Sequence, residues 1–141
     1  MTDHFTDVHQ MHHIGNIFEH SLDGQDVSMG IKMPLGEELT RADGIHELAI
    51  KNPQGGEDVY HGTSLVEKII PNAAGGHDVY DANMHLKGSI IPNVHHGHDV
   101  LHEGNLVEST LPIGHGVSTV MHYEDPLAHY SEFAMTKLIL E

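Results

Sequence analysis

The same short phrase appears three times along this chain, at intervals of 20 to 21 residues, and no other feature constrains the fold as strongly. The copies read GGEDVYHGTSLVEKIIPN from Gly55, GGHDVYDANMHLKGSIIPN from Gly75 and HGHDVLHEGNLVESTLPI from His96. Fainter copies lie at residues 24–34 and 43–53. A period of this length is typical of a supersecondary unit that is repeated along the chain.

Each copy predicts a β-hairpin. In the first, Gly55 and Gly56 supply the conformational freedom of a tight turn, and DVY after them is a short strand. HGT reverses the chain, and SLVEKII is a longer strand that ends at Pro71, because proline cannot donate a hydrogen bond to a neighbouring strand. The aspartate after the glycines is expected to cap the turn through hydrogen bonds between its side chain and the backbone. These aspartates are Asp58, Asp78 and Asp99, and they lack the dense acidic pattern of a calcium-binding loop.

The ends of the chain differ from the repeats. We expect residues 1–23 to form an N-terminal arm or short helix, and residues 114–141 to form a C-terminal segment. Asp125 and Pro126 are a good helix start, although the last residues, KLILE, equally suit a strand that pairs with a neighbouring chain. The sequence thus predicts one mainly β domain, in which tandem hairpins over residues 24–113 form an antiparallel sheet or a short solenoid, with short helical segments at the termini.

The longer strand of each hairpin carries apolar side chains on both faces. In the first copy Leu65 and Ile69 flank Glu67 on one face, whereas Val66 and Ile70 lie on the other. We therefore expect both faces to be covered at the strand ends, either by the terminal segments or by a partner.

The charge of the chain excludes several partners. There are 21 Asp and Glu residues against 6 Lys and Arg, which gives a net charge of −15 at pH 7. Nucleic acids and anionic membrane surfaces are bound through clusters of Lys and Arg, so neither is an expected partner. The lack of cysteine excludes disulfides and thiolate metal sites. No apolar run is long enough to cross a bilayer and the start has no secretory signal, so we expect a virion or cytoplasmic location.

The 16 histidines suggest metal binding or a response to pH near 6. Strand alternation places two rows of equivalent positions on one face of the repeats, namely Glu57, His77 and His98 in one row and His61, Asp81 and His102 in the other. Each row holds two histidines and one carboxylate, a ligand set that suits zinc or iron. Hairpins stacked as solenoid rungs would bring the members of a row to about 4.8 Å, whereas a flat sheet separates them by about 9.5 Å, which is too far for one ion. The reversal in each unit favours the flat sheet, and hence a polar margin without metal.

Two other histidine clusters are candidate metal sites. His9 and His13 are four residues apart on the predicted N-terminal helix, a spacing that can place both imidazoles on one ion, although no HExxH motif is present. His95, His96 and His98 lie in a predicted loop, and in a trimer His96 and His98 from three chains would surround one axial ion. The alternative for both clusters is exposed histidines without a ligand role.

The phrase GGHDVYDANMHLKGSIIPN resembles the unit of tandem hairpin-repeat proteins, which carry GG-x-D-x-Y-D about every 20 residues and occur in phage-borne and bacterial surface proteins. The resemblance covers residues 43–113. This chain departs from the pattern at Leu101, where a tyrosine is expected, and it lacks the glycine after YDAN. The resemblance implies a structural or binding role, as in a virion, and it carries over no catalytic residues.

Together these observations favour a non-enzymatic structural or interaction protein that self-associates. Short hairpins expose strand edges, and pairing with identical chains would cover them, so we expect a homo-oligomer or a complex with other structural proteins. The resemblance suggests a decoration, tail or fibre-associated component of a phage virion. A histidine-rich metal-binding or pH-responsive protein is the alternative. An enzyme of unknown class is the third hypothesis. It ranks last because no nucleophile elbow, Walker motif or dinucleotide motif identifies a catalytic site.

Overall fold

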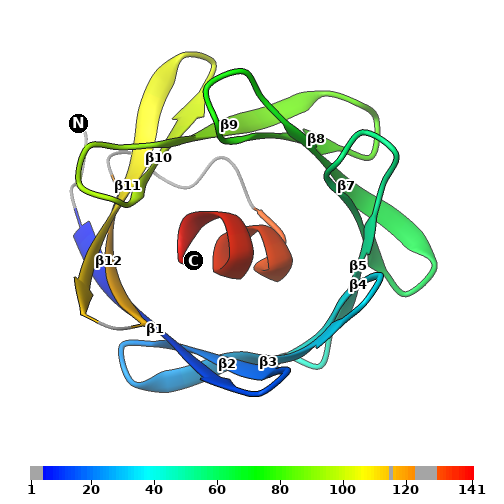
Figure 1. Cartoon of the computed structure of the whole chain (residues 1–141), viewed down its shortest axis with the longest axis horizontal. Helices are drawn as coiled ribbons and strands as arrows, with labels where there is room; N and C mark the ends of the chain where they lie inside the picture. The colour runs from blue at the N-terminus through cyan, green and yellow to red at the C-terminus, as the bar shows by residue number, and fades with distance from the viewer. Residues whose placement is uncertain (1–4, 115, 123–129) are drawn as a thin grey trace.

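The fold is a closed barrel, seen in a computed structural model that describes residues 5–114, 116–122 and 130–141. All its strand pairs are antiparallel, each strand pairs with its neighbours in the sequence, and β1 pairs with β12 to close the ring (Figure 1). The strands are β1 (Phe5–Ile14), β2 (Ile17–Leu22), β3 (Gln25–Met33), β4 (Gly36–Arg41), β5 (His46–Lys51), β6 (Glu57–His61), β7 (Ser64–Pro71), β8 (His77–Asp81), β9 (Leu86–Pro92), β10 (His98–His102), β11 (Asn105–Gly114) and β12 (Val117–His122). The predicted mainly β, hairpin-built fold is confirmed, whereas the solenoid alternative is wrong.

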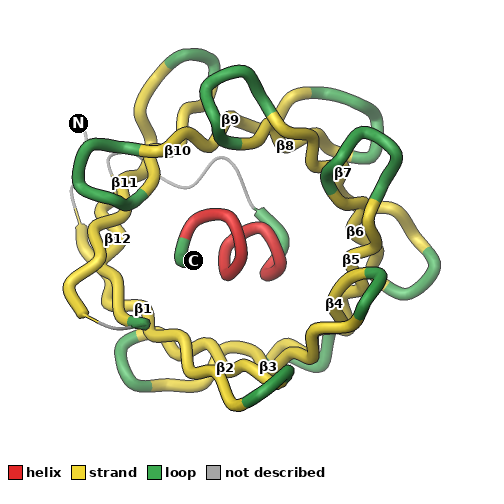
Figure 2. The backbone as a smooth tube through the Cα atoms, viewed as in Figure 1, coloured by secondary structure: helices red, strands yellow, loops and turns green. Residues whose placement is uncertain are grey.

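A short π-helix, η1 (Ala134–Ile139), lies inside the barrel and fills its lumen (Figures 1 and 2). Phe133, Ala134 and Ile139 are almost fully buried and belong to one hydrophobic core with the inward-facing side chains of the strands. We expected both faces of the strands to be covered, by the terminal segments or by a partner; the C-terminal segment covers the inner face, and cover of the outer face stays a prediction. Within the described residues, no helix has the length and apolar character needed to cross a membrane.

Glycine on the inner face of the wall makes room for large side chains, one from the wall itself and one from the inner segment. A Cβ atom at Gly30 would lie 2.3 Å from the Phe18 ring, and one at Gly88 would lie 2.0 Å from the Tyr130 hydroxyl. Both distances are far below van der Waals contact, so only glycine fits against these two side chains as they stand.

The repeated phrase forms a loop that is organised by an asparagine. The side-chain oxygen of Asn52 accepts the backbone N–H groups of Gln54 at 3.1 Å and Gly56 at 2.9 Å, and its amide donates to Asp58 at 3.0 Å. Asn72 and Asn93 make the same set of bonds in the next two repeats. The prediction that the aspartates cap the turn through backbone hydrogen bonds is wrong, because each accepts the asparagine amide instead, and Asp78 and Asp99 also accept a serine hydroxyl.

The glycine pair of the phrase serves two separate needs. Gly55 and Gly75 have φ of 88°, and His96 adopts a φ of 68° in the same column. The second glycine permits close backbone approach, because a Cβ at Gly56 would lie 1.9 Å from the carbonyl oxygen of Ile69 in the adjacent strand. The motif is therefore a hairpin connector.

Both termini depart from the sequence-based expectations. Residues 5–22 form strands β1 and β2 of the barrel rather than an arm or helix, because burial along β1 alternates, with His9 and Met11 buried and Val8 and His12 exposed. The last residues do not form a strand, since Lys137 and its neighbours belong to η1. The helix start predicted at residues 125–126 lies outside the described residues.

Closure of the ring removes the strand edges that were expected to drive self-association. On one side of the junction Val8 pairs with Thr119, and on the other β11 continues the ladder from β12. A closed barrel has no free edge to pair with another chain. Association between copies through the described residues must therefore use side chains on the outer wall or the loops.

Candidate functional site

Two buried glutamates of the wall hold the start of the inner segment. The carboxylate of Glu47 accepts the backbone N–H groups of Glu132 and Phe133, both at 2.9 Å. The carboxylate of Glu67 accepts the N–H of Ser131 at 2.7 Å and its hydroxyl at 2.6 Å. Glu47 is 0% exposed and Glu67 is 1% exposed. These bonds satisfy N–H groups that the beginning of a helix otherwise leaves without acceptors.

Each of these carboxylates also has a cationic or titratable partner on the wall. His61 donates to Glu47 at 3.0 Å, and Lys87 donates to Glu67 at 2.7 Å. Charges buried this deeply are tolerated only when they are paired and hydrogen-bonded. The carboxylates of Glu47 and Glu67 thus hold the inner segment against the wall.

A third ion pair fixes the other end of the inner segment to the wall. Lys137 of η1 donates to Glu37 of β4 at 3.0 Å. Burial alone would lower the pKa of Lys137, but the hydrogen bond to Glu37 and the nearby carboxylates outweigh it, and the pKa is raised. Burial raises the pKa of Glu57, which lies close to this pair.

A buried chain of histidines contacts the segment from β1 and β2. The Nδ1 of His20 donates to Glu132, since a carboxylate can only accept, and its Nε2 lies 2.8 Å from the Nδ1 of His9. The two imidazole rings stack with their centroids 5.0 Å apart. Ser28 also donates to Glu132, at 3.2 Å. His9 and His20 are therefore engaged in internal hydrogen bonds.

The first predicted metal row faces the lumen but does not converge. Glu57, His77 and His98 lie on β6, β8 and β10, so the alternation argument assigned them correctly to one face. One further strand separates each pair, because β7 lies between β6 and β8 and β9 between β8 and β10. Burial, and then the neighbouring His98, lower the pKa of His77.

The members of the second predicted row are each engaged elsewhere. His61 bonds to Glu47, and His102 donates from Nδ1 to the carbonyl oxygen of Lys87 at 2.6 Å. Asp81 accepts N–H groups of its own turn. Among the residues that the structure describes, no group of three His, Asp or Glu side chains is placed to hold a metal ion.

The helix-based site at His9 and His13 is wrong, because both residues lie on strand β1. Four residues of strand span about 13 Å, which is too far for one ion. Each imidazole has a different neighbour, His20 for His9 and Glu141 for His13, the latter at 3.3 Å.

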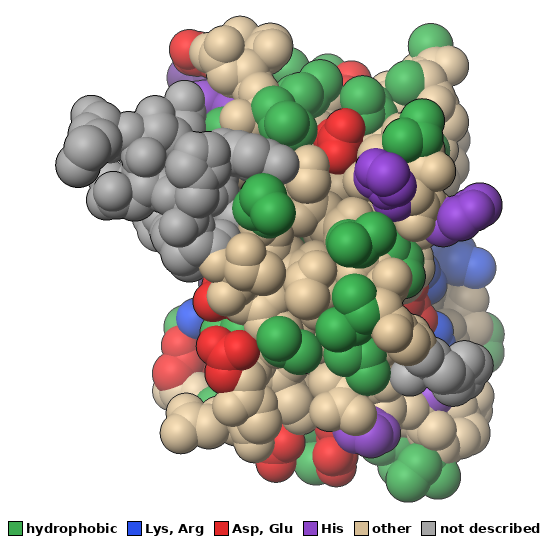
Figure 3. Space-filling view, turned by 90° about the vertical axis from the view of Figure 1, so that its left-hand side faces the viewer, with side chains coloured by type: hydrophobic (Ala, Val, Ile, Leu, Met, Phe, Trp, Pro, Cys, Tyr) green, Lys and Arg blue, Asp and Glu red, His purple; other side chains and the backbone are tan. Residues whose placement is uncertain are grey.

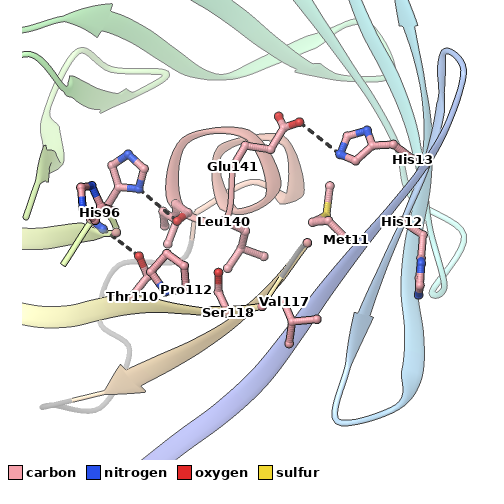
Figure 4. A pocket seen from close by; sticks show the side chains of 15 residues that line it. Met11, His12, His13, His96, Thr110, Pro112, Val117, Ser118, Leu140 and Glu141 are labelled. Atoms are coloured by element: carbon pink, nitrogen blue, oxygen red, sulfur yellow. Dashed lines mark hydrogen bonds and ion pairs between the residues drawn. The ribbon is translucent and has the colours of Figure 1, made fainter.

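A cavity of about 460 Å³ lies at one mouth of the barrel, between the end of the inner segment and strands β1 and β10–β12 (Figure 4). His98 spans it from the wall: its backbone N–H donates to Thr110 at 2.7 Å, and its Nδ1 donates to the carbonyl oxygen of Ile139 at 3.2 Å. His96 lies at the rim of this cavity on the β9–β10 loop. Of the three histidines predicted as a loop cluster, His95 and His96 are exposed on the loop, whereas His98 contacts the end of η1.

The outer wall of β1, β11 and β12 forms a surface without charge, which we call the uncharged outer face. Among the described side chains, those of these strands that point outward include no Asp, Glu, Lys or Arg; among them are Thr6, Val8, Gln10, His12, Ser109, Leu111, Ile113, Thr119 and Met121. Val8, Leu111 and Met121 are exposed, and Figure 3 shows hydrophobic side chains gathered on this side of the molecule. Sequence reasoning missed this surface, because β1 and β12 were not recognised as strands.

No family model matches the chain, and no curated protein or solved structure is significantly similar to it.

Proposed function

We propose that this protein is a non-enzymatic structural protein that self-associates through the uncharged outer face. The observation that carries the proposal is that, among the side chains the structure describes, the outward-pointing residues of β1, β11 and β12 carry no charge on a chain whose net charge is −15. Asp23 marks one border of this face, where its carboxylate accepts the backbone N–H of Val8 at 3.0 Å. Exposed apolar patches of this kind on a soluble surface mark sites of protein–protein contact.

Electrostatics favour a second copy as the occupant of this face. Two copies with a charge of −15 repel each other over most orientations, and the repulsion is weakest where the surfaces that meet carry no charge. Val8, Thr119 and Leu111 lie side by side across three strands, so their apolar groups would be buried together. Burial of such groups contributes roughly 25 cal/mol for each Å² removed from water.

The filled interior of the barrel supports the proposal that contacts with other molecules are made by the outer face. Glu47, Glu67 and Glu37 are bound by the inner segment, and the core residues of η1 fill the lumen between them. The filled lumen supports the wall from within and keeps the outer face in a fixed geometry. A decoration, tail or fibre-associated role in a phage virion remains a prediction from the repeat resemblance.

Sedimentation velocity over a concentration series tests the proposal. We expect the wild-type chain to associate, and Leu111→Glu or Met121→Glu to shift it to the monomer, because each places a charge in the contact. Ile50→Glu is the matched control, since Ile50 is an exposed outward residue on β5, on another side of the barrel. A wild-type chain that stays monomeric at every concentration would overturn the proposal, as would association that Ile50→Glu abolishes and Leu111→Glu leaves intact.

A second candidate function, a response to pH, is favoured by one observation. His20 and His61 on the wall bond to Glu132 and Glu47 at the start of the inner segment. Histidine is the side chain through which a contact with a carboxylate responds to pH near neutrality, so these two contacts are where the hold on the inner segment would depend on pH. Amide hydrogen exchange of residues 131–139 between pH 5 and 8 checks it; protection that does not change with pH after correction for intrinsic exchange rules it out.

A further inference from the structure

The loop between β9 and β10 and the outer side of β11 and β12 enclose a hollow of about 740 Å³. Leu111, Thr119 and Met121 of the uncharged outer face line one side of it, and Val94 and His95 of the loop line the other. The hollow is therefore a depression at the border of the surface proposed above for self-association.

Val94 stands at the rim of this hollow as an exposed apolar knob. Val94 is 89% exposed, more than any other large hydrophobic residue in the described part of the chain. The loop beneath it is held in place, because the side-chain oxygen of Asn93 accepts the N–H groups of His95 and Gly97, both at 3.0 Å. In the two preceding repeats the equivalent positions are Pro53 and Ala73, so the larger side chain belongs to the loop beside the uncharged outer face.

We propose that two copies of this chain pair about a two-fold axis, with Val94 of each copy inserted into the hollow of the other. This rests on the proposed function and specifies its geometry. A two-fold contact uses the same patch on both copies, so it needs a projection and a matching depression on one surface. Val94 and the Leu111 side of the hollow provide that pair, and the exposure of Val94 shows that it does not fill the hollow of its own chain.

Charge at the hollow agrees with this arrangement. Asp99 is the one carboxylate among the residues that line it, and it already accepts hydrogen bonds from Asn93 at 3.1 Å and Ser109 at 2.8 Å. His95 is adjacent to Val94 in the loop. Insertion of the loop therefore brings an imidazole N–H toward the Asp99 carboxylate of the other copy, which can accept a hydrogen bond from it.

Cysteine cross-linking tests the pairing directly, since the chain has no cysteine of its own. Chains carrying Val94→Cys are mixed with affinity-tagged chains carrying Leu111→Cys under mild oxidation. We expect a disulfide dimer that contains one chain of each kind. Ala73→Cys replaces Val94→Cys in the control, because it occupies the same loop position in the preceding repeat, and it should cross-link poorly. Equal cross-linking by both, or none while sedimentation shows association, would overturn the inference.

The Val94→Asp variant gives a second measurement. We expect it to raise the dissociation constant of the dimer by roughly tenfold or more, as for an apolar side chain lost from the centre of a contact, whereas Ala73→Asp leaves it unchanged. Dimers that withstand Val94→Asp but dissociate with Leu111→Glu would refute the knob-in-hollow geometry while leaving the proposed function in place. A wild-type chain that does not associate at all would refute both.

Discussion

The carboxylate of Glu47 on β5 accepts the backbone N–H of Phe133 at the start of the inner segment, across 86 residues of sequence. The same carboxylate accepts from Glu132 and from His61. One side chain thus joins two strands of the wall to the segment that fills the lumen. The carboxylate is fully buried, so the hydrogen bonds and the imidazole are what make its charge tolerable there.

Replacing Glu47 with alanine should destabilise the fold strongly. The substitution leaves two N–H groups and His61 without their acceptor, and we expect a loss of about 3 kcal/mol in the free energy of unfolding. Urea denaturation followed by circular dichroism measures it. Glu38→Ala is the control, because Glu38 is exposed on the outer side of β4. Equal stabilities of the two variants would show that Glu47 does not anchor the segment.

Glu57→Gln should stabilise the protein at neutral pH. Burial raises the pKa of Glu57, so the folded state prefers the protonated carboxyl and bears a cost once the group ionises. In the wild type this contribution to stability is fully present below the unfolded pKa of 4.5 and is lost as pH rises through the higher folded pKa. The variant should lack that decline. Unfolding curves at a series of pH values, compared with those of Glu38→Gln, check the prediction, and an unchanged pH dependence would contradict it.

His77→Gln should reduce the sensitivity of the fold to mild acid. Burial and the neighbouring His98 lower the pKa of His77 below 6.5, so the unfolded chain binds this proton more readily than the folded one. The wild-type stability contributed here is present above the unfolded pKa and falls as pH drops through 6.5 toward the folded pKa. Thermal unfolding between pH 5 and 7 shows the effect as a flatter profile in the variant. A profile as steep as that of the wild type, or equal flattening by His12→Gln on the outer wall, would count against it.

Tyr130→Phe should be neutral or stabilising, although the side chain is largely buried. Its hydroxyl has no hydrogen-bond partner within the described residues, and burial raises the pKa of the group. Removing an unsatisfied buried hydroxyl gains about 1 kcal/mol. Gly88→Ala should instead cost about 2 kcal/mol, because its Cβ would lie 2.0 Å from that hydroxyl. The double variant should recover part of the loss, which denaturation of all three variants measures; a loss that Tyr130→Phe does not reduce would show that the two side chains are independent.

Local chemistry made part of this fold predictable from the sequence. The glycines, the aspartate and the closing proline of each repeat predict a hairpin within some 20 residues. The structure contains these hairpins. Alternation also placed Glu57, His77 and His98 on one face, because two-residue periodicity depends only on neighbouring positions.

Closure and the lumen contacts could not be predicted in the same way. Sheets, solenoids and barrels of hairpins share one local pattern, and the choice between them depends on pairing between β1 and β12. The sequence of β1 alternates weakly, since His9, Met11 and His13 face inward while Val8 and His12 face outward, and histidines on both sides obscure the period. Glu67 was visible as a polar residue beside Ile69, but its partner Ser131 comes from the far end of the chain.

The pairing of Val8 with Thr119 also orders the events of folding. Each hairpin from β1 to β12 can form from residues close in sequence, whereas the pairing of β1 with β12 joins strands more than 100 residues apart, at a large cost in loop-closure entropy. The inner segment follows β12, so the wall is complete in sequence before its filling is. We therefore expect closure of the ring and filling of the lumen to come late in folding, and a chain interrupted before closure to expose the apolar lining of the barrel to its neighbours.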